Sequence, residues 1–375
     1  MRYRQPDYYD EFSCIGAVCP ATCCAGWQIM IDEESLDRYS QVKGDFGLRL
    51  LDSIDWYQGC FRQQDGRCSF LNKDNLCDLY QELGKEALCR TCTAYPRHTE
   101  EFEELRELSL SLSCPVAAAL ILGHTEQTVF LEREDEAVEQ EDFQDFDALL
   151  FGALEEAREY LLRLVEDRSI SLEKRMALVL KLAAVMDNAL VEGTLFELDI
   201  RKEGERLKGQ DFSAKERQVY ETRKGILEDL GQLEVLQEEW PCILKDIEQT
   251  LYHKGKGFYE NLRKDFREMY RREKQGQEWE IWGEQLLVFF LFTYFCGAVY
   301  DGYIYTKAAL SVVSVLWIQE MALCRWAKTG RLTLEDMTEL SYTYAREIEH
   351  SEDNLNLLEE MFRDNGRYGP EHLQI

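Results

Sequence analysis

Basic residues are scarce in this chain of 375 residues: 43 Lys and Arg stand against 72 Asp and Glu, which gives a formal net charge of −29. Nucleic-acid binding requires clustered Lys and Arg that neutralise phosphates, and the sequence has no such cluster. We therefore predict no nucleic-acid partner. Solubility explains the acid excess more simply than a basic partner does.

Long apolar runs and targeting segments are missing as well. The most apolar run, Leu286–Val299, has 14 residues, fewer than the roughly twenty that span a bilayer. It is followed by Asp301 and a second apolar stretch at 303–318, a pattern that favours a buried helical hairpin over membrane insertion. The N-terminal residues MRYRQPDYYDEF contain no apolar segment of the signal-peptide type. We expect a cytoplasmic protein without membrane insertion.

Several enzyme signatures do not occur. The sequence has no P-loop, no HExxH and no strand-associated GxGxxG. The CxxxCxxC of radical enzymes is excluded because Gly26 occupies the third cysteine position after Cys19 and Cys23. His98 lies beside Arg97 and is more typical of a surface residue than of a metal ligand.

Cysteine, in contrast, is abundant and concentrated. Ten of the 13 cysteines lie between residues 14 and 114, and the stretch CIGAVCPATCC at 14–24 alone holds four. Without a secretion signal, such density indicates metal binding or redox chemistry rather than disulfides. The other three, Cys242, Cys296 and Cys324, lie in helical sequence, where we expect buried, small apolar side chains.

The cysteine spacings suit a metal site built from several segments. Cys89 and Cys92 form a CxxC, and Cys19 and Cys23 are separated by three residues, so each pair can converge on one metal. Thiolate-rich sites suit zinc or an iron–sulfur cluster. A zinc-stapled module without chemistry, or simply buried thiols, are the alternatives. Cys23 and its neighbour Cys24 point to opposite faces of an extended chain, so the backbone bends there or the two thiols differ in role.

The chain divides into a cysteine-cluster domain at 1–130, an acidic linker or helix edge at 131–147, and a helical domain at 148–375. The linker contains EREDEAVEQEDFQD, with eight acids in fourteen residues. We predict a mainly α fold: a small cysteine-rich, metal-binding N-terminal domain with short extended segments, followed by an all-α helical body.

Local signals predict where several helices begin. Asp32 is expected to cap a helix, and Pro115 to open another, with Cys114 at its N-terminus. The helix dipole should lower the pKa of the Cys114 thiol. Capping-box patterns occur at Ser213 with Glu216, and at Thr333 with Asp336. The aromatic residues of the C-terminal two-thirds are expected in the core.

Three segments, taken in order, resemble the flagellin lysine-N-methylases. They are PDYYDEFSCIGAVCPATCCAGWQIMID, RCSFLNKDNLCDLYQELGKEALCRTCTAYPR and LSLSLSCPVAAALIL, and together they cover residues 6–122. These proteins contain a cysteine-cluster domain described as zinc- or iron-chelating. The chain departs from the family pattern at Pro20 and Ala21, where an acidic residue is expected, and at Val116 and Ala119, where Glu and Arg are expected.

The resemblance implies a methyltransferase that moves the methyl group of S-adenosylmethionine to lysine ε-amines of flagellin, and that contains a [4Fe–4S] cluster, with zinc as the alternative metal. Carried over residue by residue, the metal-site candidates are Cys14, Cys19, Cys23, Cys24, Cys68, Cys77, Cys89, Cys92 and Cys114. Cys60 lies outside the matching motifs.

The lysine amine must be neutral to accept a methyl group, whereas free lysine has a pKa near 10.4. The site must therefore desolvate the amine or offer a base, and Tyr8, Tyr9, Tyr80 and Tyr95 are weak candidates, each better explained by packing. The alternative function is non-catalytic: a metal carrier, or an electron-transfer or structural module that holds an iron–sulfur or zinc centre.

Overall fold

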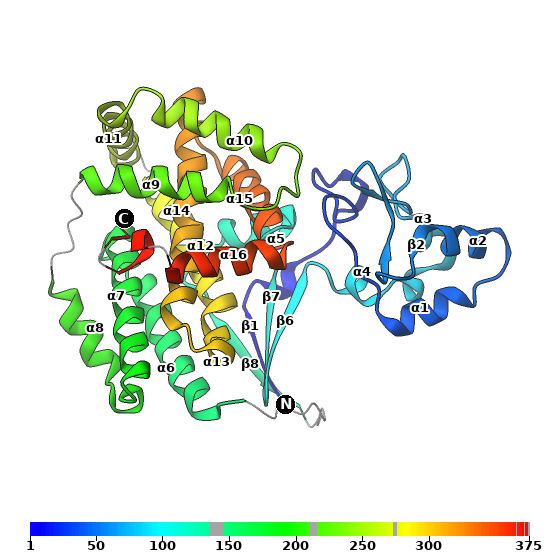
Figure 1. Cartoon of the computed structure of the whole chain (residues 1–375), viewed down its shortest axis with the longest axis horizontal. Coiled ribbons are helices and arrows are strands. Elements are labelled where there is room, and N and C mark those ends of the chain that lie inside the picture. Colours follow the sequence, from blue (N-terminus) through cyan, green and yellow to red (C-terminus); the bar gives the residue numbers. More distant parts are fainter. Residues whose placement is uncertain (136–145, 211–215, 273–275, 365, 371, 374–375) are drawn as a thin grey trace.

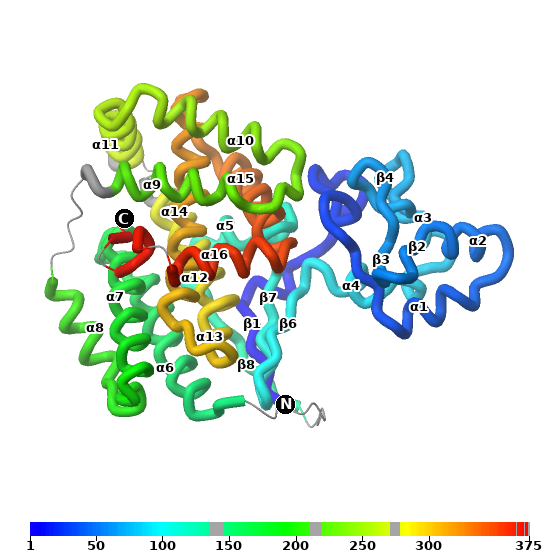
Figure 2. The backbone as a smooth tube through the Cα atoms, viewed as in Figure 1, coloured from blue at the N-terminus to red at the C-terminus, as the bar shows by residue number. Residues whose placement is uncertain are grey.

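The structure is a computed structural model of residues 1–375, and it describes all of them except 136–145, 211–215, 273–275, 365, 371 and 374–375. A large helical body and a small lobe lie side by side (Figure 1). The small lobe is formed by the blue and light-blue part of the chain, which leaves the body after the first strand and returns through α4 to β6 (Figure 2).

The strands are β1 (Arg2–Pro6), β2 (Ile54–Asp55), β3 (Cys60–Phe61), β4 (Gln63–Gln64), β5 (Arg67–Cys68), β6 (Arg97–Phe102), β7 (Leu105–Leu110) and β8 (Phe130–Glu134). The first helices are α1 (Glu33–Ser40), α2 (Gly44–Ser53), α3 (Asp78–Leu83), α4 (Arg90–Ala94) and α5 (Pro115–Gly123). The helices that follow are α6 (Ala148–Val165), α7 (Leu172–Val191), α8 (Ile200–Lys208), α9 (Glu216–Leu230), α10 (Trp240–Ile247), α11 (Lys256–Arg272), α12 (Gly276–Tyr294), α13 (Ala298–Asp301), α14 (Ile304–Thr329), α15 (Leu334–Ile348) and α16 (Glu352–Asp364).

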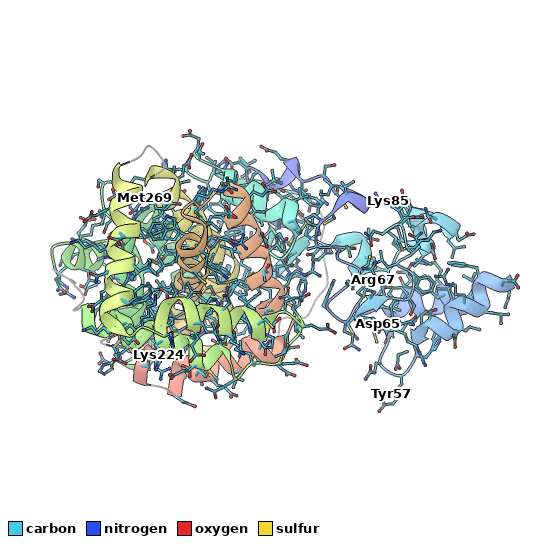
Figure 3. All side chains as sticks on the ribbon, turned by 90° about the horizontal axis from the view of Figure 1, so that it is seen from above. Tyr57, Asp65, Arg67, Lys85, Lys224 and Met269 are labelled. Carbon is cyan, nitrogen blue, oxygen red and sulfur yellow. The ribbon has the colours of Figure 1, made fainter. Side chains whose placement is uncertain are left out.

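The small lobe has a hydrophobic core of its own. Buried side chains from residues 29–89, among them Tyr39, Leu50, Phe61 and Phe70, form one cluster that is separate from the core of the body. Seen from above, the lobe stands apart from the body and carries Tyr57, which is 98% exposed, at its surface (Figure 3). The lobe is therefore held by its own packing and reaches the body through a limited junction.

A four-stranded sheet packs against the body, in the order β6-β7-β1-β8. β1 is parallel to β7 and antiparallel to β8, so residues from the start of the chain pair with residues about a hundred positions later. Glu107 of β7 accepts hydrogen bonds from Arg4 of β1 (3.1 Å) and from Arg158 of α6 (2.6 Å to Oε2), and all three side chains are buried. This charged group fixes the sheet to α6.

Helices α12 and α14 form the centre of the body. The stretch Glu278–Asp301, which runs from α12 through α13, and the stretch Ile304–Thr329, which is α14, are long and apolar enough to cross a membrane by length and composition. In each, most of the apolar window lies buried inside the body: 78% for the first and 89% for the second. The core aromatic residues Trp282, Phe290 and Trp317 are buried as predicted. The two helices thus pack as the buried hairpin expected from the sequence.

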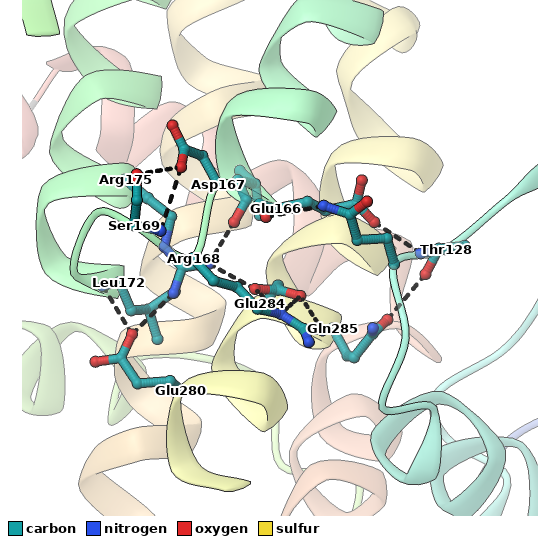
Figure 4. Close-up of polar contacts among 12 residues, drawn as sticks. Thr128, Glu166, Asp167, Arg168, Ser169, Leu172, Arg175, Glu280, Glu284 and Gln285 are labelled. Atoms are coloured by element: carbon teal, nitrogen blue, oxygen red, sulfur yellow. Dashed lines mark hydrogen bonds and ion pairs between the residues drawn. The ribbon is translucent and has the colours of Figure 1, made fainter. Parts of the chain in front are cut away.

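A polar group locks α12 to the loop between α6 and α7 (Figure 4). Arg175 donates to Glu284 Oε2 at 2.6 Å, and Arg168 donates to the other oxygen, Oε1, at 2.8 Å. Nearby, the backbone N–H of Thr128 donates to Glu166 at 2.7 Å. Because Glu284 is fully buried, these two guanidinium groups are needed to balance its charge.

The predicted helix starts are confirmed at three places. The side chain of Asp32 accepts from the backbone N–H of Ser35 at 3.0 Å, α5 begins at Pro115, and Thr333 and Asp336 form a capping box at α15. The capping pattern predicted at 213–216 lies partly outside the described residues. The mainly helical character of the chain is confirmed, but the sheet was not predicted.

The two cores divide the chain differently from the predicted boundary at residue 130. Tyr8, Tyr9 and the apolar residues of 102–122 belong to the core of the body, because the sheet and α5 pack against helices. Of the predicted linker at 131–147, residues 131–134 belong to β8, and 136–145 lie outside the described part. Cys296 and Cys324 are buried as predicted, whereas the expectation for Cys242 is wrong, since this side chain is exposed.

Candidate functional site: a thiol-lined pocket at the junction of the lobes

A pocket of about 790 Å³ opens at the junction of the two lobes. It is lined by residues of the N-terminal loop (12–29), of the segment from 71 to 97, and of the start of α5. Seven of the nine predicted metal-site cysteines lie on its wall: Cys14, Cys19, Cys23, Cys24, Cys77, Cys92 and Cys114. The other two, Cys68 and Cys89, are buried. The structure therefore brings together thiols from four separate sequence segments.

The backbone turns sharply at the two adjacent cysteines. Gly26 has φ +85°, a left-handed conformation that favours glycine, and its N–H donates to the carbonyl of Gly66 at 2.9 Å. The carbonyl of Cys24 accepts from the N–H of Cys68 (2.8 Å), and that of Cys23 accepts from the indole N–H of Trp27 (2.7 Å). These bonds hold the loop against β5 and present both thiols to the pocket.

One residue of the body holds this loop from the other side. Arg346, on α15, donates to the carbonyls of Ala21 (3.0 Å), Thr22 (3.2 Å) and Ala25. Its guanidinium is buried, and a Cβ at Gly26 would come within 3.2 Å of it. Because these three hydrogen bonds come from one residue of α15, the geometry of the thiol loop depends on the helical body.

The CxxC is placed by a short helix. Cys89 is the residue before α4, and the next backbone N–H, of Arg90, donates to Asp32 Oδ2 at 2.7 Å. The hydrogen bond from Cys92 lowers the pKa of the Cys89 thiol, and the same interaction raises the pKa of Cys92. The same arrangement recurs at the adjacent pair, where the hydrogen bond from Cys23 lowers the pKa of Cys24 to about 7.

Cys23 and Cys24 have different thiol neighbours. The pKa of Cys23 is raised first by its bond to Cys24 and by burial, and then by the charges of Cys24, Cys14 and Cys114. The charge of Cys24 also raises the pKa of Cys19 and, on the small-lobe side, those of Cys68, Cys77 and Cys92. The sequence left open whether Cys23 and Cys24 differ in role. The structure favours a difference, because the two thiols have different surroundings.

The donor chemistry suits a thiolate-bound metal, but the ligands are not arranged around one point. All the cysteines are free thiols. Within the described part of the chain, no three side chains of His, Cys, Asp or Glu are grouped closely enough to hold a metal ion. The thiols that surround the pocket fit a soft metal or an iron–sulfur cluster in kind and placement, and ligation would require side-chain rotations.

The expected low pKa of Cys114 is wrong. Cys114 is the residue before α5, and the nearby backbone N–H groups of Ala117 and Val116 lower the pKa of its thiol. Burial is the larger effect, and it raises the pKa of the thiol above its ordinary value. A helix N-terminus therefore does not offset desolvation here.

The four tyrosine candidates separate into two pairs. Tyr80 and Tyr95 line the pocket. Tyr8 and Tyr9 are buried in the core of the body, where Tyr8 contacts the ring of His124 at 5.5 Å, so packing explains them. Cys60 lies in β3, where its sulfur contacts Gln28 Nε2 at 3.0 Å. It is not among the pocket-lining residues, which agrees with its omission from the predicted site.

Some site residues gave no signal in the sequence. Arg346 lies near the end of α15 and His350 just after it, more than 230 residues beyond the last pocket cysteine, Cys114. The ring of His350 lies 4.7 Å from the ring of Trp27 and 6.1 Å from that of Tyr95. Nothing in the local sequence EIEHS indicates this contact, because it depends on how the body packs against the loop.

Comparison with known families decides the relationship. Residues 158–375 match the model of the FliB lysine N-methylase C-terminal domain, which is more than half of the chain. The chain belongs to the FliB lysine N-methylase family. Arg346 and His350 lie within the matched region, so in this FliB-family protein the family domain contacts the loop whose residues line the pocket.

Individual proteins similar to this chain have names that fit this family. The lysine-N-methylases of Salmonella choleraesuis strain SC-B67 and Salmonella typhimurium strain LT2 are each 29% identical over 139 residues, which cover 34% of this chain and 34% of theirs. The flagellar biosynthetic protein FliU of Salmonella muenchen is 30% identical over 140 residues, which cover 35% of this chain and 82% of FliU. The match therefore spans about a third of the length of the two lysine-N-methylases. No solved structure matches this chain.

Proposed function

We propose that this protein is a lysine N-methyltransferase that transfers the methyl group of S-adenosylmethionine to lysine ε-amines of flagellin in the cytoplasm. The observation that carries the proposal is the family match over 158–375, combined with the contacts of Arg346. Through these contacts the family domain supports the cysteine loop. The names of the relatives, lysine-N-methylase and FliU, support lysine as the acceptor and a flagellar substrate.

The pocket offers what the two substrates require. Its volume of about 790 Å³ lies in the range of small-molecule sites, so it can take a donor of this size together with a lysine side chain. Trp27 and Tyr95 supply aromatic faces, which attract a sulfonium or ammonium cation. Lys85 and Arg97, also on the wall, are suited to the carboxylate of the donor.

A [4Fe–4S] cluster is the cofactor we propose, with zinc as the alternative. Cys24, Cys77 and Cys92 on the pocket wall, with Cys68 and Cys89 behind it, are the group that would hold it. Held by three of these thiolates, such a cluster would offer an iron to the amino and carboxylate groups of the donor. The chain itself positions the amine and removes its proton.

The test is anaerobic purification with iron and sulfide analysis, followed by incubation with methyl-labelled S-adenosylmethionine and flagellin. We expect iron and acid-labile sulfide, and label on flagellin lysines. Flagellin with its lysines blocked by acetylation is the control and should stay unlabelled. A colourless protein that contains only zinc would remove the iron–sulfur cluster. An intact cluster without label on flagellin would instead favour a non-catalytic carrier or electron-transfer protein.

A further inference from the structure

A chain of hydrogen bonds leads from the pocket wall into the body. The hydroxyl of Tyr95 lies 3.0 Å from the Oγ of Ser113, and Ser113 Oγ lies 2.6 Å from the Oγ of Ser111. Ser111 in turn donates to Glu349 Oε2 at 3.2 Å. Tyr95 is a pocket residue, whereas Glu349 follows α15 on the other side of Ser113. The four side chains thus connect the pocket to a carboxylate outside it.

The direction of these bonds is determined by a histidine. His350 Nε2 lies 2.8 Å from Ser113 Oγ, and His350 Nδ1 is buried without a hydrogen-bond partner among the described residues. Burial lowers the pKa of His350 to about 3, so its ring is neutral. The proton then sits on Nε2, and His350 donates to Ser113. Because Ser111 donates to Glu349, Ser113 donates to Ser111, and its remaining lone pair accepts from Tyr95.

Glu349 is placed to accept a proton at neutral pH. Burial raises its pKa to about 7, and its position at the C-terminus of α15 also disfavours the charged form. Tyr294 of α12 donates to its Oε1 at 3.2 Å. The other ionisable groups that face it are His98, from β6, and Tyr344, from its own helix.

We propose that Tyr95, Ser113 and Ser111 carry the proton of the substrate ammonium to the carboxylate of Glu349. The inference rests on the proposed function and names its proton acceptor. An N–H bond of the lysine ammonium breaks as its proton passes to the oxygen of Tyr95. The protons of Tyr95, Ser113 and Ser111 each move one oxygen along the chain, and Glu349 becomes a carboxylic acid.

The neutral amine then attacks the donor. Its lone pair forms the new N–C bond to the methyl carbon, and the S–C bond breaks with its electron pair left on sulfur, which becomes a neutral thioether. Neither the proton transfer nor the methyl transfer needs an oxidant or a further reactant. Tyr80, the other pocket tyrosine, is 51% exposed and therefore lies in water, where its hydroxyl gives no directed path into the body.

The test compares Glu349→Gln with two controls at exposed glutamates, Glu352→Gln and Glu335→Gln, in single-turnover methyl transfer between pH 5.5 and pH 9.5. For the unchanged protein we expect the rate to fall below an apparent pKa near 7. Glu349→Gln should be about 100-fold slower at pH 7, within the range of general acid–base catalysis, and should recover toward pH 9.5 as free amine appears. Both controls should keep the original profile. A Glu349→Gln profile that retains the limb near pH 7 would overturn the proposal.

A second measurement does not depend on methyl transfer. In infrared spectra of the full-length protein with isotope-labelled glutamate, the protonated-carboxyl band that titrates near pH 7 should lose one component in Glu349→Gln, while the component of Glu166, whose pKa burial also raises to about 7, should remain. Ser111→Ala should shift the Glu349 component, because Ser111 is its hydrogen-bond donor. A titrating band without methyl transfer would contradict the proposed function but would still support the hydrogen-bonded path to Glu349. A carboxyl titration between pH 6 and pH 8 that is unchanged in Glu349→Gln refutes the proton path.

Discussion

Replacement of Arg346 by Met should release the thiol loop from the body. The change keeps most of the side-chain length but removes the guanidinium that donates to the carbonyls of Ala21, Thr22 and Ala25. A hydrogen bond with one charged partner contributes about 1.5–3 kcal/mol. The three carbonyls are only partly buried and can bind water instead, so we expect a combined loss of about 2–4 kcal/mol in the free energy of local opening.

This loss can be measured as thiol reactivity. Since 1.36 kcal/mol is a factor of ten, alkylation of Cys23 and Cys24 should become roughly 30- to 900-fold faster in the metal-free protein. Mass spectrometry of timed samples gives the rate at each cysteine. Arg325→Met is the matched control, because Arg325 pairs with Asp336 at the surface, and it should leave the rates unchanged. Equal rates in Arg346→Met and the unchanged protein would refute the view that the body holds the loop.

Three further predictions concern the metal, the pH dependence and the sheet. Cys92→Ser should lose most of its iron on anaerobic purification, whereas Cys60→Ser should retain it; full iron in Cys92→Ser would remove this residue from the ligand set. The pKa of Glu349 is raised from 4.5 to about 7, so the folded state binds more protons than the unfolded state between these values, and stability falls by at most about 3 kcal/mol as the pH rises from 4.5 to 7. Urea unfolding of Glu349→Gln should show a smaller fall over the same range, and an identical slope would contradict the raised pKa. Glu107→Gln leaves the buried charge of Arg158 without its carboxylate and should cost about 3–5 kcal/mol. An unchanged melting temperature would show that this pair is not needed to fix the sheet.

Local features of the chain were readable from the sequence because their causes are local. Asp32, Pro115 and Thr333 begin helices through contacts within three residues, so the residue types alone predict them. The apolar stretches of α12 and α14 likewise predict burial from composition. The concentration of cysteines predicted thiols around one site, and the structure places seven of the nine candidates on the wall of one pocket.

Other features depend on contacts between distant segments. The parallel pairing of β1 with β7 joins residues about a hundred positions apart, and no short pattern specifies such a partner. The low pKa expected at Cys114 followed from its helix, but burial, which only packing determines, reverses it.

The sequence by itself therefore determined the helices, the cysteine-rich segments and the buried hairpin, since each follows from neighbouring residues. Only the tertiary structure decided that Cys23 and Cys24 have different thiol neighbours and that Arg346 closes the loop around them. It also decided that Tyr95 leads through two serines to Glu349. The physical reason is the same in each case: hydrogen bonding and desolvation act through space, and the residues that line the pocket and those that support it from behind come from distant parts of the chain.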